Sequence, residues 1–332
     1  MSKRNDEYEH TQPTVRDNSV TEAHDGREYV RWAYRLLLGR DPESIETIEK
    51  NPFLNDRRRL VQSILDSDEF RNSYISVYRQ NDLSYPRVDR FDLSNIEDHR
   101  LREYALAGYN TIDGWGLNDY LINIFLSLDH YQKNRSIVGN VFEIGVFHGR
   151  VLILLGLATQ ACERVIGLDI FETFQLHNID KSGGHATKEI AERNLERYGL
   201  KEKTELIVGD SLFVDFSKHP ALSNIRFAHI DGAHYVDALV NDLVKTQHVM
   251  VPGGIIAVDD YTHMGFPSVS EGCHRFLSFA TPRLVVPFAV GWNKLFLTTH
   301  SHHSDLINYL REIVTERPLI EIHGFDAVSL SD

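Results

Sequence analysis

The stretch VFEIGVFHGR, residues 141–150, determines how the rest of the sequence is interpreted. An apolar run carries Glu143 at its end and continues through Gly145 and Gly149. This pattern predicts a strand that turns through glycines into a helix. Glycine has no Cβ, so such a turn brings backbone N–H groups and a helix N-terminus close to a ligand. We therefore expect a nucleotide-type ligand at this turn.

The spacing of the glycines narrows the choice of ligand. The motif E-x-G-x-x-x-G is looser than the G-x-G-x-x-G that holds a pyrophosphate in dinucleotide-binding proteins. Its acid, Glu143, precedes the glycines and suits a ligand with positive charge. S-adenosylmethionine, which carries an ammonium and a sulfonium group, is such a ligand. A glycine turn with no ligand remains an alternative, so the motif must be judged with the rest of the chain.

Composition and charge limit the class of protein. The 332 residues exceed one typical domain, which favours one full α/β domain and a smaller module. A net charge of −13, from 35 Lys+Arg against 48 Asp+Glu, argues against nucleic acid or an anionic membrane as partner. We expect a small-molecule or glycan acceptor, and a homo-oligomer is compatible with the sequence. The two distant cysteines, Cys162 and Cys273, and the absence of a long apolar segment favour a cytoplasmic protein without a membrane span.

The N-terminal third divides into three parts. Residues 1–27 are polar and aperiodic, so we expect a disordered tail. Residues 28–80 show helical periodicity and predict a small all-α module, whose third helix would carry Phe70, Tyr74 and Tyr78. The segments YVRWAYRLLLGRDPES and LVQSILDSDEF resemble a short helical domain of unassigned function that recurs beside carbohydrate-active enzymes. Residues 81–112, with Pro86 and many charges, read as a linker.

From residue 113 onward, strands and helices alternate, which predicts a parallel sheet with right-handed crossovers. A helix over 117–131 leads into the first strand. We expect strands at 138–143, 164–169, 204–208, 225–230 and 254–258, and helices at 149–161, 186–198, 234–249 and 268–280. The runs 283–290 and 293–299 predict a hairpin. We assign residues 113–300 to this domain and 301–332 to a C-terminal helix and tail.

Acidic residues follow five successive predicted strands. In open α/β sheets ligands lie beyond the carboxyl ends of the strands, so these side chains should meet at one edge. They are Glu143, Asp169, Asp210, Asp231, Asp259 and Asp260. Because clustered carboxylates repel one another, we expect a cation among them. Asp169 can accept from ribose hydroxyls and Asp210 from the adenine amine, although helix caps or solvated loop acids are the alternatives.

Five motifs together carry a resemblance to a known family. EIGVFHGR, GLDIFE, VGDS, IDGAHYVDALVNDL and VPGGIIAVDDY resemble class I S-adenosylmethionine-dependent methyltransferases, closest to the macrocin and mycinamicin type of sugar O-methyltransferase. The resemblance implies a Rossmann-like, doubly wound sheet of seven strands ending in an antiparallel hairpin. It implies methylation of a sugar hydroxyl on a glycan or glycosylated small molecule. The cofactor-binding residues we expect are Glu143, Gly145, Phe147, Gly149, Asp169, Ile170, Gly209, Asp210, Ser211 and Asp231.

The resemblance also implies a metal and a base. Asp231, Asp259 and Asp260 match the family's divalent-metal ligands, and carboxylates on neighbouring strand ends suit Mg²⁺. Some relatives carry an acid where this chain has Ala233, and His234 matches the histidine general base of the mycinamicin type. We expect neutral His234, titrating near ~6.5, to take the acceptor proton. His263 is the second candidate for a catalytic residue.

Two other readings of the sequence remain open. A metal-free N- or C-methyltransferase would use the same sheet, and Asp259-Asp260 is the feature that argues against it. A catalytically inactive methyltransferase-like protein could act as a scaffold in glycan assembly through the helical module. We also expect residues 173–185, with the Gly183-Gly184 pair as a hinge, to form a lid over the site.

Overall fold

A computed structural model describes residues 26–38, 40–54, 56–65, 67, 69, 93, 96–182, 184–314 and 317–330. The chain forms two compact units, residues 1–84 and 85–332. The first contains α1 (Gly26–Leu38), α2 (Ile45–Glu49) and α3 (Arg57–Leu65), and its small core includes Val30, Ile48 and Leu60. The short α2, capped by the side chain of Ser44, is absent from the sequence prediction. Residues 1–25 of the predicted tail and the helix bearing Phe70 lie outside the described residues, whereas residues 26 and 27, predicted as tail, already belong to α1.

The second unit is built on a mixed sheet of nine strands in the order β3-β2-β1-β4-β5-β7-β6-β9-β8. Its strands are β1 (Asn140–Ile144), β2 (Val165–Asp169), β3 (Thr204–Val208), β4 (Ile225–Ile230), β5 (Met250–Val258), β6 (Val285–Gly291), β7 (Lys294–Thr299), β8 (Leu319–Ile322) and β9 (Phe325–Ser329). Strands β1 to β5 are mutually parallel, and β7 is antiparallel to both β5 and β6. The predicted Rossmann-like sheet and antiparallel hairpin are therefore confirmed.

The expected count of seven strands is wrong for this chain. Residues 301–332, predicted as a helix and tail, contain α11 (His303–Ile313) followed by β8 and β9. Strand β9 pairs in parallel with β6, and β8 pairs antiparallel with β9. Ala327, Val328 and Leu330 are fully buried there. The extra hairpin covers the edge of β6, which would otherwise present unpaired backbone groups.

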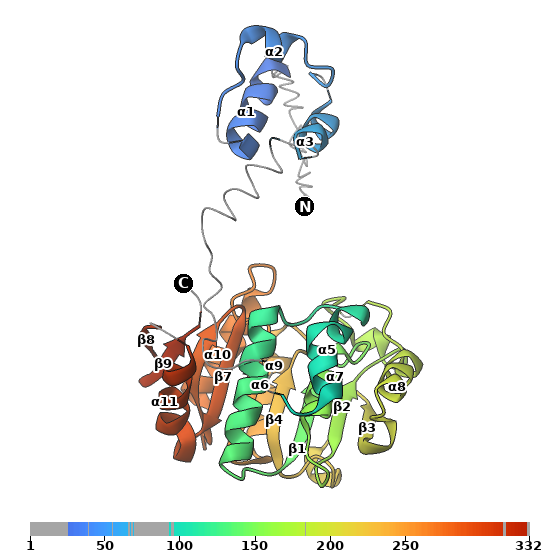
Figure 1. Ribbon diagram of the computed structural model, residues 1–332, viewed down its shortest axis with the longest axis vertical. Helices are drawn as coiled ribbons and strands as arrows, with labels where there is room; N and C mark the ends of the chain where they lie inside the picture. The colour runs from blue at the N-terminus through green and yellow to red at the C-terminus, as the bar shows by residue number, and fades with distance from the viewer. Residues whose placement is uncertain are drawn as a thin grey trace, which may run out of the picture. The chain divides into compact units, whose positions relative to one another are not determined.

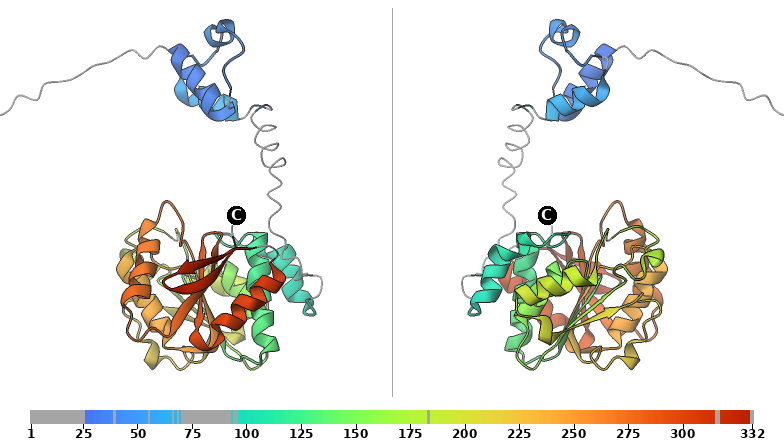
Figure 2. Two further views of the ribbon diagram at one scale, coloured as in Figure 1. Left: turned by 90° about the vertical axis from the view of Figure 1, so that its left-hand side faces the viewer. Right: turned by 90° about the vertical axis from the view of Figure 1, so that its right-hand side faces the viewer.

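Helices cover both faces of the sheet, as Figures 1 and 2 show. One face packs against α5 (His99–Leu106), α6 (Asp119–Asn134), α7 (Arg150–Ala158), α8 (Lys188–Arg197) and α11. The opposite face packs against α9 (Val236–Gln247) and α10 (Pro267–Phe279). Successive strand residues alternate between the two cores, as a pleated strand requires: Phe227 faces one core and Ala228 the other. No helix in the described part of the chain is long and apolar enough to span a membrane.

Part of the predicted linker belongs to the core. Within residues 81–112 the structure places α5 and the 3₁₀ helix η2 (Gly108–Thr111), where Leu101, Tyr104 and Tyr109 are buried. The Tyr104 hydroxyl donates to the Arg150 carbonyl at the start of α7. The many charges of this stretch obscured the short apolar face of an eight-residue helix. The large unit therefore begins well before residue 113.

The order of the strands positions the site. The chain runs outward from β1 to β2 and β3, and then returns to β4 on the other side of β1. At such a reversal the loops after β1 and β4 diverge and leave a crevice beyond the carboxyl ends of the strands. Glu143 lies within β1, Asp169 ends β2, and Asp231 and Asp259 directly follow β4 and β5. The parallel register therefore places these acids along one edge.

Candidate active site

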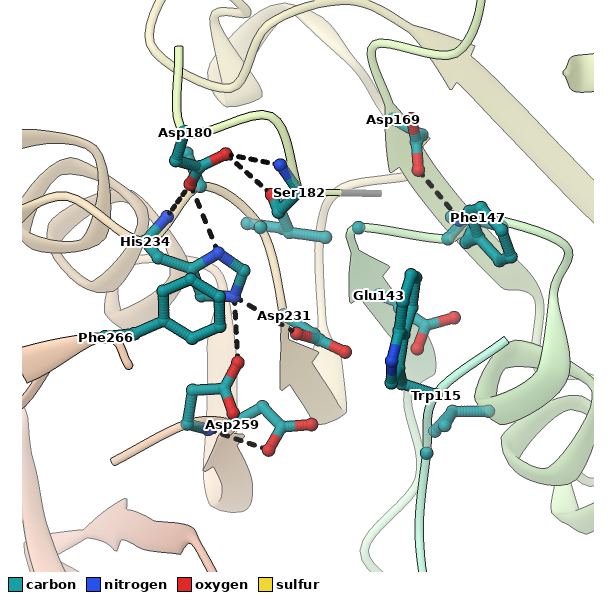
Figure 3. A pocket seen from close by; sticks show the side chains of 18 of the residues that line it. Trp115, Glu143, Phe147, Asp169, Asp180, Ser182, Asp231, His234, Asp259 and Phe266 are labelled. Carbon is teal, nitrogen blue, oxygen red and sulfur yellow. Dashed lines mark hydrogen bonds and ion pairs between the residues drawn. The ribbon is translucent and has the colours of Figure 1, made fainter. Parts of the chain in front are cut away.

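A cavity of about 790 Å³ lies at this edge of the sheet. Of the residues predicted to bind cofactor, metal or acceptor, every one except Gly149 lines it. Figure 3 shows that Glu143 and Asp169 come from one side of the cavity and that Asp180, His234 and Asp259 come from the other. The sequence prediction that acids from successive strands converge on one site agrees with this geometry.

The two glycines of the opening motif have conformational roles that the sequence did not distinguish. Gly145 has φ +86°, and a Cβ there would lie 1.7 Å from the Asp231 carbonyl oxygen. This glycine is therefore required by the close approach of the chain after β4. Gly149 adopts φ +87° at the N-cap of α7 and does not line the cavity. It lets the chain enter α7, and a direct contact between Gly149 and a ligand is not supported.

Glu143 is buried and has one oxygen without a partner. Its Oε1 lies 2.8 Å from Nδ1 of His229 on β4, whereas Oε2 makes no hydrogen bond. Burial raises the pKa of Glu143, and the neighbouring His229 opposes that rise. Burial lowers the pKa of His229, but the carboxylates of Asp259 and Glu143 outweigh it and raise that pKa to about 9. The pair thus presents an unused carboxylate oxygen at the cavity wall.

Asp169 holds the loop after β1 in place. Its Oδ2 accepts from the backbone N–H of Phe147 at 2.8 Å, and its Oδ1 accepts from that of Phe171 at 2.6 Å. Each carboxylate oxygen keeps a second lone pair for a ligand that enters the cavity. Burial raises the pKa of Asp169, and these backbone hydrogen bonds lower it. Asp169 therefore joins the turns after β1 and β2.

The predicted lid segment contributes side chains at two points of the cavity. His177, in the 3₁₀ helix η3 (Gln175–His177), places Nδ1 2.7 Å from Oδ2 of Asp210. Further along, the Asp180 carboxylate accepts a hydrogen bond from the backbone of the loop after β4. Ser182 donates to the same carboxylate through its backbone N–H and its hydroxyl. Gly183 lies outside the described residues. The segment thus connects the loop after β3 with the loop after β4.

His234 lies between two carboxylates (Figure 3). Its backbone N–H donates to Oδ2 of Asp180 at 2.6 Å, and its Nδ1 lies 3.1 Å from the same oxygen. Nε2 lies 2.8 Å from Oδ2 of Asp260 and 4.0 Å from Oδ1 of Asp231. The Phe266 ring stacks on the imidazole at a centroid distance of 3.9 Å. The ring is therefore fixed in plane and orientation.

This environment changes the expected protonation of His234. Burial lowers its pKa, but the carboxylates of Asp180 and Asp260 outweigh burial and raise the pKa to about 10. The expectation of a neutral imidazole titrating near ~6.5 is therefore wrong for the arrangement described. The sequence could not reveal this because Asp180 lies 54 positions away from His234.

The chain itself supplies cations to the acid cluster. The ammonium of Lys294, at the start of β7, contacts Oδ1 of Asp259, and both side chains are largely buried. Burial raises the pKa of Asp259, but Lys294 and His229 outweigh it and hold that pKa below its usual range. Asp231 has less compensation: burial and the charge of Asp259 raise its pKa to about 7. The cation expected among the acids is thus supplied in part by Lys294 and His229.

Two overlapping groups of side chains could hold a metal ion among the described residues. Their donor atoms lie within 4.8 Å of one another: His229 with Asp231 and Asp259, and Asp231 with His234 and Asp260. Asp231 is common to both groups. The predicted ligands Asp231, Asp259 and Asp260 are thus divided between two groups, each completed by a histidine that sequence spacing did not single out as a ligand.

His263 and several unpredicted residues complete the site. The His263 ring stacks on Phe266 at 4.8 Å, on the side of the cavity that also holds His234. Trp115, Asp180 and Lys294 also line the cavity, but they come from segments far apart in sequence. Lys294 directly follows the hairpin turn, and no motif around it would have identified it.

One family model matches the part of the chain that forms the site. Residues 142–261 match a family model described as a methyltransferase domain. This part of the chain is therefore similar to methyltransferase domains. The matched residues run from β1 through the acids that follow β5, and so contain most of the cavity wall. Among curated proteins, none matches this sequence.

Several solved structures are similar to this chain at low sequence identity. The O-methyltransferase NovP is 15% identical with a TM-score of 0.50, over 63% of this chain and 99% of NovP. TomG from Streptomyces achromogenes, an O-methyltransferase solved with S-adenosylmethionine, is 18% identical with a TM-score of 0.44, over 66% and 98% of the two chains. CalS11, a TDP-rhamnose 3′-O-methyltransferase, is 17% identical with a TM-score of 0.41, over 70% and 95%. The likeness to NovP supports the fold assignment.

Proposed function

We propose that this protein is a Mg²⁺-dependent O-methyltransferase that methylates a sugar hydroxyl on a glycan or a glycosylated small molecule. The observation that carries the proposal is the position of His234, Asp231 and Asp260 at one end of a cavity whose other end is lined by Glu143 and Asp169. A methyl donor and a hydroxyl acceptor can therefore lie side by side. NovP, which shares the fold, is described as an O-methyltransferase.

We assign the donor to the end of the cavity formed by the loops after β1, β2 and β3. The unpartnered Oε2 of Glu143 can accept from the donor's ammonium group, which offsets the cost of leaving that buried oxygen unpaired. Asp169 has lone pairs left for the ribose hydroxyls. We assign Asp210, which also lines the cavity, to the adenine amine. Holding the donor in line with the acceptor is the main contribution to methyl transfer.

The carboxylates at the acceptor end fit a divalent cation in their chemistry. Asp231 has a raised pKa because buried negative charge around it is incompletely compensated, and a cation would compensate it. We propose Asp231, Asp259 and Asp260 as ligands. Lys294 already contacts Asp259, and Asp260 lies against His234 and Asn293, so Asp231 has the most free coordination capacity. When bound, Mg²⁺ would polarise the acceptor hydroxyl and lower its pKa.

We propose His234 as the group that accepts the hydroxyl proton. In the arrangement described its two nitrogens lie near Asp180 and Asp260, and both carboxylates favour the charged ring. Engagement of Asp260 as a metal ligand would remove one of them and free Nε2. Asp180 would remain on Nδ1 and would hold the ring with Nε2 toward the acceptor. His263 is the second candidate.

The proposal is tested by methyl transfer to a panel of sugars and glycosides with radiolabelled donor. Activity should fall when the metal is removed with chelator and should return with Mg²⁺. His234→Ala should lower kcat by about 10²–10⁴-fold, the usual contribution of general acid–base catalysis. Donor affinity, measured separately by calorimetry, should stay within about twofold.

Three outcomes would contradict parts of the proposal. Undiminished turnover in chelator would exclude the metal requirement. A near-normal rate in His234→Ala would move the base to another residue, and His263→Ala would then be compared. Donor binding without transfer to any hydroxyl would favour the metal-free N- or C-methyltransferase or the inactive scaffold.

A further inference from the structure

The turn between β6 and β7 consists of two residues, Trp292 and Asn293. Both have positive φ, +50° and +68°. Positive φ at both central residues is characteristic of the type I′ turn, which commonly joins the strands of a tight hairpin. Both residues also line the cavity. The turn therefore belongs to the site as well as to the sheet.

The backbone is strained in this turn and in the loop after β5. Asparagine and glycine tolerate positive φ, whereas a bulky residue such as Trp292 rarely adopts it. Trp292 is held there by Nε1, which donates to the Leu330 carbonyl at 2.9 Å, and by its ring, which packs against Tyr120 at a centroid distance of 5.8 Å. Asp260 also has positive φ, +57°. Such strain is concentrated at functional sites, where surrounding contacts hold it.

Asn293 holds the loop after β5 at three successive residues. Its backbone carbonyl accepts from the Tyr261 N–H at 3.1 Å. Its Oδ1 accepts from the Thr262 N–H at 3.1 Å, and its Nδ2 donates to Oδ1 of Asp260 at 2.7 Å. The Thr262 N–H can only donate, so it fixes which end of the amide is the oxygen and leaves the NH₂ group toward Asp260. Both ends of the side chain are therefore engaged.

These contacts divide the Asp260 carboxylate between two partners. Oδ1 accepts the charge-assisted hydrogen bond from Asn293, and Oδ2 lies 2.8 Å from Nε2 of His234. With Oδ1 held, Oδ2 stays directed into the acceptor end of the cavity. Lys294, the next residue along the chain, contacts Asp259. Two consecutive residues of the hairpin thus each hold one of the two adjacent acids.

We propose that Asn293 is a positioning residue for the acceptor end of the site, because it fixes Asp260 so that Oδ2 meets His234 or the divalent cation. The inference rests on the proposed Mg²⁺-dependent O-methyltransferase function. Groups that orient a metal-binding carboxylate usually contribute 10–100-fold to metal affinity or activity. Glu143 and Asp169, at the donor end, make no hydrogen bond with Asn293, so donor binding does not depend on it.

The variant Asn293→Gly of the full chain tests the role of the amide. Glycine keeps the positive φ of the turn and removes the side chain, so the hairpin should still form. Without metal, hydrogen exchange measured by NMR should become about tenfold faster at the Thr262 amide, which loses its acceptor. Mg²⁺ affinity, measured by calorimetry, and kcat should each fall about 10- to 100-fold. Donor affinity should stay within about twofold.

The same substitution at a second asparagine gives the matched control. Asn224 also has positive φ, +53°, but it is exposed, precedes β4 directly and does not line the cavity. Asn224→Gly should leave exchange at Thr262, Mg²⁺ affinity and kcat unchanged. Equal losses in both variants would contradict a specific role of Asn293.

Three further results would overturn the inference. Unchanged exchange at Thr262 in Asn293→Gly would show that the amide does not hold the loop. Faster exchange with unchanged Mg²⁺ affinity and kcat would show that the held loop does not affect the site. A lower Tm with faster exchange throughout β6 and β7 would assign Asn293 to the fold alone.

Failure of the proposed function gives a different result. The wild-type protein would then bind no Mg²⁺ or would methylate no hydroxyl. Exchange at Thr262 needs neither metal nor acceptor, so it would still decide whether Asn293 holds the loop that carries Asp260.

Discussion

At the scale of single residues, the site depends on pairs of acids and bases that come from distant segments. Asp180 holds the Nδ1 side of His234 through an oxygen that also accepts from the His234 backbone. Lys294 and His229 neutralise part of the charge on Asp259. These partners determine which carboxylates remain available for ligands, and so each can be tested separately.

The first prediction concerns Asp180 as a residue that positions His234. In Asp180→Asn the amide keeps the size of the side chain but loses the charge that orients the imidazole. We expect kcat to fall about 10- to 100-fold with little change in donor affinity. Steady-state kinetics and calorimetry with the donor measure the two effects. Asp215→Asn, which removes a carboxylate that contacts Ser217 and Lys218 outside the cavity, should change neither.

The second prediction concerns Asp242 on α9. This carboxyl is buried with Oδ2 unpartnered, and burial raises its pKa to about 7. The unfolded chain titrates near ~3.9, so the folded state favours the protonated form. Below about pH 4 the carboxyl is protonated in both states, so it does not reduce the free energy of unfolding. As the pH rises from about 4 to about 7, that free energy falls by roughly 1.4 kcal/mol for each unit by which the two pKa values differ.

Asp242→Asn should remove this pH dependence. Its free energy of unfolding, from urea denaturation, should exceed that of the wild type at pH 8 by about 1–4 kcal/mol and differ less at pH 5. Asp237→Asn, exposed on the same helix, serves as the control. If the difference in free energy of unfolding between the wild type and Asp242→Asn is the same at pH 5 and pH 8, Asp242 is ionised in the folded protein without an energetic penalty.

At the scale of elements, the hairpin β8–β9 changes how the sheet ends. Its outer strand β8 is exposed at Leu319, whereas Leu330, just after β9, is completely buried. The Leu330 backbone N–H donates to Val290 on β6, and the Leu330 carbonyl accepts from Trp292, a residue of the cavity wall. The hairpin therefore supports both the edge of the sheet and part of the site.

The third prediction compares two leucines of this segment. Leu330→Ala should cost about 2–5 kcal/mol of unfolding free energy, the range for removing a buried leucine. Leu319→Ala should cost about 0.5 kcal/mol or less because Leu319 already contacts solvent. Chemical denaturation of the two variants gives the comparison. Similar small losses for both would mean that β9 is not part of the core.

At the scale of the whole molecule, the chain is one large unit that carries the site and one small helical unit. Every residue that lines the cavity lies after residue 114. The large unit also needs α5 and η2, because Tyr104 and Tyr109 are buried within it. The large unit therefore begins at residue 85, whereas the sequence motifs predicted a domain that begins at residue 113.

The fourth prediction separates the two boundaries. Removing residues 1–84 should leave Tm unchanged, because no part of the large unit is lost. Donor affinity should stay within about twofold of that of the full chain, because no part of the site is lost. Removing residues 1–112 should lower Tm by about 10 °C or abolish folding, because it deletes a buried helix. Thermal melts and calorimetry compare the two truncations. Loss of donor binding in the shorter deletion would show that the small unit contributes to the site.

The sequence by itself determined the alternation of strands and helices and the acids that end five strands. These features are local, because the spacing of apolar residues and the glycine turns depend on residues close together in the sequence. Successive βαβ units make the strands parallel, and parallel strands end at the same edge of the sheet. The same local signals missed α5, whose apolar face spans only eight residues. They also missed β8 and β9, which are stabilised by pairing with a strand from another part of the chain.

Only the tertiary structure decided which groups compensate the acids. Asp180, His229 and Lys294 reach the site from three different loops or strands, and no spacing in the sequence links them to Asp259 or His234. The protonation of His234 follows from these contacts, because electrostatic interactions depend on distance in space and on burial.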